Sequence, residues 1–346
     1  MSDVEHGRAV LELVDTALDA VGCATSAEGP AFRCGPTTVR IRTVGARRPT
    51  YPPFSHLPAA SDAAQADASR ELVVHVCDGD FPGGAECRPP RGFHRVRDDS
   101  RFVAATDGPP IVDALRRSDR SALSWIDDVA HEPPYVRFRP LAEIFSAWFP
   151  TQGMVLLHAA AVGDRHGAVL LVGNGGSGKS TTAVSCSQAG IGFLADDFCL
   201  LEPGPTPRVH SLYRSAKLRG DSGHVAAGVD SAAPEALDGD HYFLVDDDDT
   251  VVSAPVLAIV AVSPAVDTAT PRLRRVSHDD ALAHLLPTAL KLPSGGDVAY
   301  RLWLRTAHTL ARGVATYTLE LTWDTARVVE LVHDVLQVSG AEVSFT

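Results

Sequence analysis

Lysine is scarce in this sequence. Of the 31 lysines and arginines, only three are lysine: Lys179, Lys217 and Lys291. Because arginine and lysine serve almost equally well on solvated surfaces, this ratio indicates a GC-rich coding bias rather than a physical requirement. Under such a bias, a lysine that persists marks a position where the planar fork of arginine does not suit the role. We therefore treat these three positions as candidate functional sites.

Other scarcities exclude whole classes of protein. No apolar run approaches the roughly 20 residues that cross a bilayer, so no membrane partner is expected. The net charge of −12 argues against nucleic-acid binding, which depends on clustered cations. The six cysteines share no CxxC or metal-ligand spacing, and residues 1–7 carry no export signal. These features predict a cytoplasmic protein with reduced cysteines.

The first half of the chain is rich in β-type runs. A chain of 346 residues, 45% hydrophobic and 21% charged, is typical of one large or two ordinary globular domains. Residues 4–21 have helical amphipathic spacing, residues 51–70 suggest an exposed loop, and residues 140–149 suggest a closing helix. The runs expected to form a small antiparallel sheet are residues 37–43, 71–77, 93–96, 102–106 and 122–126. We therefore expect residues 1–150 to form a β-rich α+β domain.

Residues 151–346 mix apolar strands with helices, which predicts an α/β domain. A strand over 154–162 and another over 168–172 are expected to form a hairpin around a turn at 163–167. Further strands are expected at 191–195, 256–262 and 315–321, and helices at 179–189, 278–286, 297–311 and 325–337.

The strongest motif is GNGGSGKS at residues 173–180, which fits the pattern GxxxxGK[ST] in full. Its glycines let successive backbone N–H groups point at phosphate oxygens, and the following helix adds its positive end. In this motif Lys179 reaches the β- and γ-phosphates, and the Ser180 hydroxyl ligates Mg²⁺. A chance glycine-rich turn is the alternative, but it does not account for the strand before and the helix after. The expected nucleotide-binding residues are Gly173, Asn174, Gly175, Gly176, Ser177, Gly178, Lys179, Ser180 and Thr181.

A second motif is an apolar run that ends in two adjacent acids, Asp196 and Asp197. A helix over 179–189 descends about 16 Å and the strand 191–195 returns by about the same distance, which brings both acids to the edge that holds the glycine motif. Adjacent residues of a strand face opposite sides, so one acid is expected to hold Mg²⁺ and the other to accept a proton. Two acids that merely end a strand at a solvated edge are the alternative.

His158 is the third candidate. In the expected hairpin, the numbers of facing residues sum to about 330, which brings His158 near Val172 and the start of the glycine motif. A histidine within an apolar strand is also commonly a hydrogen-bonded core residue. The sequence leaves both interpretations open.

Together, His158 before a hairpin, GNGGSGKS, and LADD at residues 194–197 resemble the C-terminal catalytic domain of HPr kinase/phosphorylase over roughly residues 151–340. That family has a P-loop kinase core similar to ATP-dependent phosphoenolpyruvate carboxykinase, so the resemblance implies this fold. It implies a catalytic role for His158 and Lys179, with Asp197 as the proton acceptor. Ser180 and Asp196 would hold Mg²⁺, ATP would be the donor, and a homo-oligomer is implied.

The sequence departs from the family in two places. Where HPr kinases have Glu-Ile-Arg-Gly, with a metal-ligating carboxylate, the nearest match is KLRG at residues 217–220. A lysine in place of this acid weakens any inference of phosphorolysis or a second metal site. Residues 1–150 do not resemble the family's N-terminal domain. Shorter relatives in natural-product gene clusters phosphorylate a serine of a precursor peptide, which implies a peptide acceptor.

Several weaker features complete the set of candidates. Lys217, Arg219 and Lys291 are candidate substrate or phosphate contacts, and solvated surface positions are the alternative. The acidic run at residues 246–249 resembles a metal site but favours a hairpin turn. The four tryptophans are apolar-flanked and expected in cores: Trp125, Trp148, Trp303 and Trp323.

The sequence therefore predicts a Mg²⁺-dependent kinase that transfers the γ-phosphoryl group of ATP to a hydroxyl group, with a serine of a peptide or protein favoured. Residues 1–150 would recognise the acceptor, and residues 151–346 would carry the chemistry. Two alternatives remain open at this point. One is a small-molecule alcohol kinase of the same fold, and the other is a P-loop NTPase switch without an acceptor.

Overall fold

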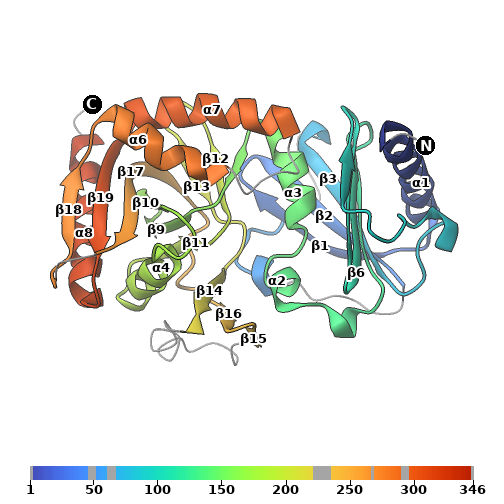
Figure 1. The fold of residues 1–346 in the computed structure, drawn as a ribbon, viewed down its shortest axis with the longest axis horizontal. Helices are drawn as coiled ribbons and strands as arrows, with labels where there is room; N and C mark the ends of the chain where they lie inside the picture. The colour runs from blue at the N-terminus through green and yellow to red at the C-terminus, as the bar shows by residue number, and fades with distance from the viewer. Residues whose placement is uncertain are drawn as a thin grey trace. The chain divides into compact units, whose positions relative to one another are not determined.

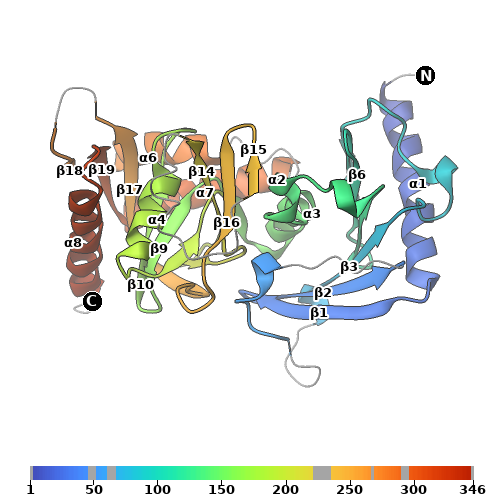
Figure 2. The same cartoon turned by 90° about the horizontal axis from the view of Figure 1, so that it is seen from below.

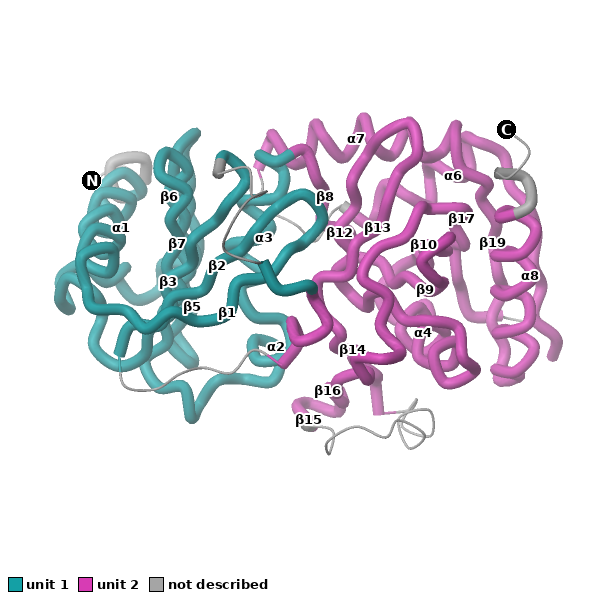
Figure 3. The backbone as a smooth tube through the Cα atoms, turned by 180° about the vertical axis from the view of Figure 1, so that it is seen from behind, with its two compact units in different colours: residues 1–51, 58–152 teal, residues 52–57, 153–346 magenta. Residues whose placement is uncertain are grey.

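The structure is a computed structural model that describes residues 3–45, 52–60, 68–220, 235–265, 269–289 and 296–343. It divides into two compact units (Figure 3). Unit 1 comprises Met1–Tyr51 and Pro58–Gln152, and unit 2 comprises Pro52–Leu57 and Gly153–Thr346. All candidate site residues fall within the sequence range of unit 2.

Unit 1 is built on a mixed sheet that has seven strands among its described residues, in the order β1-β2-β3-β7-β6-β5-β4. β2 is parallel to β3 and β3 is parallel to β7, whereas the other pairs are antiparallel. The prediction of an antiparallel sheet was therefore wrong for two pairs. The strands are β1 Ala27–Cys34, β2 Thr37–Val44, β3 Glu71–Asp78, β4 Arg95–Arg97, β5 Arg101–Asp107, β6 Pro110–Arg116 and β7 Ser121–Ile126.

Two of these strands were not predicted, and their sequences explain why. β1 contains the Gly29-Pro30 pair, and β6 begins at Pro110 and carries an acid, Asp113, so neither has a clean apolar alternation. The parallel pairing of β2 and β3 requires a crossover of about a dozen residues or more. The sequence between Val44 and Glu71 is long enough to supply it.

One face of this sheet is covered by helix α1 (Asp3–Cys23), as the amphipathic spacing predicted. Its apolar residues, including Val14 and Leu18, form a buried cluster with Val103 and Trp125 of the strands. The short helices α2 (Pro134–Arg137) and α3 (Ala142–Trp148) follow the last strand. Figure 1 shows α1 and α3 on either side of the sheet.

Unit 2 is a mixed α/β structure whose main sheet has nine strands among the described residues. Its order is β11-β9-β10-β17-β13-β12-β8, with β19 pairing to β17 and β18 pairing to β19. β10, β17 and β19 run parallel, and β9 runs antiparallel to both β10 and β11. The strands are β8 Val155–Leu157, β9 Ala160–Asp164, β10 Gly167–Val172, β11 Phe193–Ala195, β12 Cys199–Glu202, β13 Arg208–His210, β17 Ser253–Pro264, β18 Arg272–Arg275 and β19 Ala315–Leu321.

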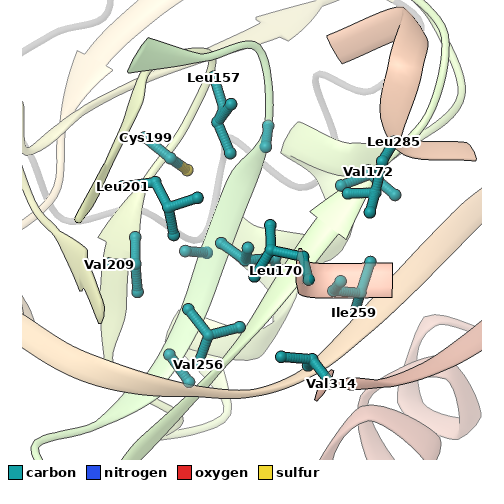
Figure 4. Packing of buried hydrophobic residues seen from close by; sticks show 14 of the residues in the cluster. Leu157, Leu170, Val172, Cys199, Leu201, Val209, Val256, Ile259, Leu285 and Val314 are labelled. Carbon is teal, nitrogen blue, oxygen red and sulfur yellow. The ribbon is translucent and has the colours of Figure 1, made fainter. Parts of the chain in front are cut away.

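Both faces of this sheet are covered by helices. Leu170 and Val172 of β10 pack with residues of α6 and α7 (Figure 4), and Val169 and Leu171 pack on the other face with residues of α4 and α8. Burial on both faces produces the continuous apolar runs seen in the sequence. The helices are α4 Lys179–Gln188, α6 His278–Leu285, α7 Gly296–Gly313 and α8 Thr325–Val343.

One edge of the main sheet collects the chain segments that carry polar residues. Because β10, β17 and β19 are parallel, their carboxyl ends at Val172, Pro264 and Leu321 lie along the same edge. β11 also ends there, since both it and β10 are antiparallel to β9. In open α/β sheets this edge is where ligands bind.

A small antiparallel sheet, β14 (Ser215–Arg219), β16 (Asp240–Leu244) and β15 (Glu235–Leu237), completes unit 2 (Figure 2). The segment Pro52–Leu57 also belongs to this unit. Phe54 is 4% exposed and stacks on Tyr213, with 5.5 Å between the ring centroids. The prediction of an exposed loop was therefore wrong for this segment, because aromatic residues distant in the sequence bury it.

The long strand predicted over residues 154–162 is two strands. β8 pairs with β12, β9 pairs with β10, and His158 and Ala159 lie between the two strands. In the hairpin Val162 faces Val169, so the predicted register was close, and the turn is only residues 165–166. A continuous apolar run does not reveal that its two halves pair with different partners.

The acidic run at residues 246–249 forms a turn but not a hairpin. The Asp249 N–H donates to the Asp246 carbonyl at 3.2 Å, while β16 pairs with β14 and β15 and Thr250 bridges to Phe193. Within the described part of the chain, no cluster of three or more His, Cys, Asp or Glu residues is placed to hold a metal. None of the described helices is long and apolar enough to cross a membrane.

Candidate active site at the glycine loop

The glycine loop, residues 173–178, connects β10 to α4 and requires glycine at several positions. Gly173, Gly176 and Gly178 have φ angles of 147°, 79° and 99°. A Cβ atom on Gly173 would lie 2.6 Å from the Val262 carbonyl oxygen, and one on Gly178 would lie 2.3 Å from Leu321 Cδ1. The loop therefore owes its shape to glycine's backbone freedom and to close packing against β17 and β19.

Lys179 is held at the centre of this loop. Its side chain is largely buried, at 5% exposure, and its Nζ donates hydrogen bonds to the carbonyl oxygens of Gly173 at 2.9 Å and Asn174 at 3.1 Å. Lys179 is also the first residue of α4, whose N-terminus carries partial positive charge. A buried ammonium and a helix N-terminus together form a site suited to an anion.

Asp196 lies beside the loop and is almost fully buried, at 2% exposure. Ser180 Oγ donates to Asp196 Oδ1 at 2.7 Å, and the backbone N–H of Lys217 donates to Asp196 Oδ2 at 3.0 Å. Hydroxyl and carboxylate oxygens are the donors that Mg²⁺ prefers, and protein sites for Mg²⁺ often supply only one or two ligands beside water and phosphate. The Ser180 and Asp196 pair fits such an ion.

Asp197 and His158 form a second pair. His158 Nδ1 and Asp197 Oδ1 are 2.9 Å apart, and their side chains are 12% and 16% exposed. Asp197 follows β11 with a φ of 69°, a left-handed conformation that a non-glycine residue seldom adopts. The turn in the backbone sends the two adjacent acids to different partners, since Asp196 contacts Ser180 and Asp197 contacts His158.

The position of His158 depends on the break between β8 and β9. Its backbone N–H donates to the Thr288 carbonyl at 3.1 Å instead of to a neighbouring strand. The residue therefore leaves the ladder at the edge where the glycine loop begins. His158 therefore lies between two strands rather than within one, and its side chain pairs with Asp197.

The His158–Asp197 pair and the loop line one cavity of about 200 Å³. Lys217 and Arg219, both on β14, line the same cavity. Lys217 Nζ donates to Asp240 Oδ2 at 3.1 Å, and Arg219 lies close to the loop, with Nη1 3.0 Å from where a Cβ on Gly176 would be. Asp196 lies behind this lining, in contact with Ser180.

The structure brings together most of the site residues predicted from the sequence. His158, Lys179, Asp197, Lys217 and Arg219 all border the cavity, as do residues 175–181. Gly173 and Asn174 contribute their carbonyl groups to Lys179. Lys291 lies outside the described residues.

Sequence reasoning missed three contributors to this region. Asp240 was not singled out because its role arises only from cross-strand pairing of β14 and β16, which places it opposite Arg219 and near Lys217. Thr288 was missed because it contacts His158 through its backbone. Trp323 was expected in a core and is 84% exposed, whereas the other three tryptophans are at most 2% exposed.

The nearest cysteine has no place in the chemistry. Cys199 on β12 is fully buried, and burial, with a smaller effect of Asp196, raises the pKa of its thiol well above the usual range. A thiol that stays protonated is a poor nucleophile. The reactive groups of this region are therefore its oxygen and nitrogen side chains.

Comparison with known proteins yields little. No protein-family model matches the chain, and no curated protein matches its sequence. Among solved structures, one that resembles it is the HPr(Ser) kinase/phosphatase from Coxiella burnetii, with 11% identity over 55% of this chain and 98% of that chain. The TM-score is 0.29, and a likeness at that level carries no conclusion about activity. The function is therefore inferred from the residues of the site.

Proposed function

We propose that the protein is a Mg²⁺-dependent kinase that transfers the γ-phosphoryl group of ATP to a hydroxyl acceptor. The observation that carries the proposal is a single cavity in which an anion-binding loop with Lys179 faces a carboxylate, Asp197, paired to His158 at 2.9 Å. Phosphoryl transfer to an alcohol needs both parts, because the phosphates must be neutralised and the alcohol must lose a proton.

The triphosphate would bind to the glycine loop. The backbone N–H groups of the loop offer hydrogen-bond donors, and the N-terminus of α4 adds positive charge. The Lys179 ammonium, bound to the Gly173 carbonyl, adds a further charge at the loop. Lysine suits this position because its compact charge can lie between β- and γ-phosphate oxygens. Arg219 and Lys217 of β14, which line the same cavity, would add positive charge.

Magnesium would be held by Ser180, with Asp196 fixed beside it by the 2.7 Å hydrogen bond. The ion supplies charge neutralisation to the phosphate oxygens when it is bound. The second oxygen of Asp196 accepts the Lys217 N–H, which fixes the orientation of the carboxylate. Lys217 takes the position of the acid that a second metal would need, so the proposal includes one Mg²⁺.

Asp197 would accept the proton of the acceptor hydroxyl as the oxygen attacks the γ-phosphorus. The bond between that phosphorus and the β–γ bridging oxygen breaks, and ADP leaves with the electron pair. His158, bound to Asp197 Oδ1, would orient the carboxylate and stabilise its charge. Such transfer depends mainly on positioning and electrostatics, so these few residues suffice.

For the acceptor we propose a serine of a peptide or protein, the class that the sequence motifs favour, with a natural-product precursor peptide first among them. Unit 1 would contribute to its recognition, and Lys291 would contribute a contact to the substrate or its phosphates. A photo-reactive analogue of the acceptor peptide should label residues of unit 1. Labelling confined to unit 2 would contradict the recognition role.

The decisive experiment is incubation with γ-labelled ATP, Mg²⁺ and candidate acceptors, with mass spectrometry to detect the gain of one phosphate. Transfer to a peptide serine supports the proposal in full. Transfer only to a small alcohol would show that the acceptor is a small molecule and not a peptide. ATP turnover that is equally fast with no acceptor would identify an NTPase switch instead.

A further inference from the structure

The cavity that Asp197 and His158 line is too small for a whole nucleotide. It measures about 200 Å³, whereas pockets that enclose small-molecule ligands measure roughly 300–1,000 Å³. It suits phosphate groups and the attacking oxygen. A nucleoside attached to those phosphates must therefore extend into a neighbouring space.

A second cavity, of about 620 Å³, lies on the other side of the glycine loop. Four residues line both cavities: Gly176, Ser177, Gly178 and Thr181. The loop is thus a shared wall, and a ligand bound to it can reach both spaces. The lining of the second cavity includes Leu321, Val328 and Trp323, with Asp324 as the one charged side chain among its described residues.

The topology of the sheet explains this position. Going from β11 through β10 to β19, the carboxyl-terminal edge presents first the two acids, then the glycine loop, then the segment after β19. The Ala265 N–H donates to the Leu321 carbonyl at 2.8 Å, which ties the ends of β17 and β19 together. Leu321 also packs against the loop, since its Cδ1 lies 2.3 Å from where a Cβ on Gly178 would be. Figures 1 and 2 show α4 and α8 next to each other, and both pack on the same face of the sheet.

Trp323 lies in the segment between β19 and α8, two residues after Leu321. At 84% it has the highest exposure of the large apolar side chains in the described residues. Indole rings stack on any nucleobase, because every base has an aromatic face. An exposed indole on the wall of an apolar cavity that adjoins an anion-binding loop has the chemistry of a base platform.

We infer that the base of the bound nucleoside triphosphate stacks on Trp323, in the cavity opposite the acids, while its phosphates cross the glycine loop to Lys179. This inference rests on the proposed function, and it assigns the nucleoside half of the ligand to residues of β19 and α8. It also separates the tasks of the two cavities, with affinity for the base on one side of the loop and the reaction on the other.

Another cavity of similar size lies elsewhere in unit 2. It measures about 630 Å³ and is lined by Gly163, Gly190, Leu257 and His333, around the turn between β9 and β10. That turn lies at the opposite ends of the strands from the glycine loop. A nucleoside bound there could not connect to phosphates on the loop.

The test compares ligands with and without a base. Calorimetry would measure the affinity of a non-hydrolysable ATP analogue and of inorganic tripolyphosphate, both with Mg²⁺, for the wild type, Trp323→Ala and Trp323→Phe. Base stacking predicts that Trp323→Ala lowers the affinity for the analogue by roughly 5- to 100-fold and leaves the affinity for tripolyphosphate unchanged. Trp323→Phe, which keeps an aromatic face, should stay within about threefold of the wild type.

Tyr300→Ala provides a matched control, since Tyr300 is 53% exposed on α7 and does not line the cavity. It should leave both affinities unchanged. Tryptophan fluorescence gives a second readout, because the other three tryptophans are at most 2% exposed. In the wild type, binding of the analogue should quench the emission of Trp323, which the Trp323→Phe variant lacks. Tripolyphosphate should not quench it.

The outcomes separate the two proposals. If both ligands bind the wild type but Trp323→Ala binds the analogue as tightly as the wild type does, the base lies elsewhere and the inference is overturned, while nucleotide binding stands. If the wild type binds neither ligand, the proposed nucleotide site fails and the base platform fails with it. If Trp323→Ala lowers the affinity for both ligands equally, Trp323 supports the conformation of the loop and does not bind the base, and the inference is also overturned.

Discussion

Two enclosed carboxylates, one in each unit, have opposite surroundings. In unit 2 both oxygens of Asp196 accept hydrogen bonds, from Ser180 Oγ and from the backbone of Lys217. In unit 1 Asp113 Oδ1 is enclosed, and no described residue hydrogen-bonds to that oxygen. Burial raises the pKa of Asp113 to about 7, against the opposing effect of a hydrogen bond from Ser124.

The cavities next to these two acids differ in volume. Asp113 borders a space of only about 30 Å³, walled by residues such as Val76, Ile111 and Leu141. Asp196 adjoins the glycine loop and its larger cavity. Donors stabilise a carboxylate charge and apolar walls oppose it. A buried acid therefore indicates a reactive site only where donors and a ligand-sized space accompany it.

The largest expected effect is at Asp197. In Asp197→Asn the amide keeps the shape of the side chain but cannot accept a proton, so kcat should fall by about 10²- to 10⁴-fold. Affinity for a non-hydrolysable ATP analogue should stay within about threefold. Steady-state kinetics and calorimetry measure the two quantities. A wild-type kcat would show that another group takes the proton.

The second-largest effect is expected at Asp196, whose carboxylate accepts two hydrogen bonds. Asp196→Asn should lower activity at low Mg²⁺ by roughly 10- to 100-fold, because the residue orients the Ser180 hydroxyl toward the ion. The activity should recover in part as Mg²⁺ is raised. An unchanged Mg²⁺ dependence would show that Asp196 does not act on the metal ion. If the loss of activity came with a comparable loss of thermal stability, the role of Asp196 would be structural.

Asp113→Asn should have the opposite profile, with kinase activity unchanged and stability altered. Because burial raises the pKa of Asp113 from 3.8 to about 7, the folded state binds a proton that the unfolded state has lost. The wild-type unfolding free energy should therefore fall as pH rises from about 4 to about 7, and then level off.

Asparagine cannot ionise, so the variant should be more stable than the wild type at pH 8. The difference should be up to roughly 4 kcal/mol, because one pKa unit corresponds to about 1.4 kcal/mol. Urea unfolding at pH 5 and pH 8 provides the measurement. An identical pH dependence in the two proteins would mean that Asp113 is ionised in the folded state, and the contrast with Asp196 would then fail.

The smallest effect is expected at Lys217. The Lys217–Asp240 pair is partly exposed, with both side chains at 28%, and such pairs contribute little. Lys217→Gln should therefore lower kcat/KM by about two- to fivefold, since the backbone N–H that Asp196 accepts remains. A loss of a hundredfold or more would show that the ammonium contacts the transferred phosphate directly.

Local patterns identified the elements that depend on local chemistry. The strand Ala315–Leu321 and the start of α4 at Lys179 match the predictions. Ser277 caps α6 by accepting a hydrogen bond from the Asp280 N–H. The glycine loop was recognisable because its conformation demands glycine at fixed positions. The meeting of Ser180 and Asp196 was predictable from the lengths of one helix and one strand.

Pairings between distant segments were not predictable in this way. The break at His158 depends on β12 and Thr288, and the parallel pairs of unit 1 depend on a crossover. Trp323 was expected in a core, but the packing of Leu321 against the glycine loop places the segment that carries the indole beside a cavity.

The sequence by itself therefore determined the glycine loop, its lysine and the pair of acids, because backbone freedom and periodicity act over a few residues. Only the tertiary structure decided that His158 leaves its strand and that two different cavities flank the loop. These features depend on segments more than a hundred residues apart, such as Thr288 beside His158 and Leu321 beside Gly178. Their contacts follow from how the sheet assembles, which no short pattern in the chain records.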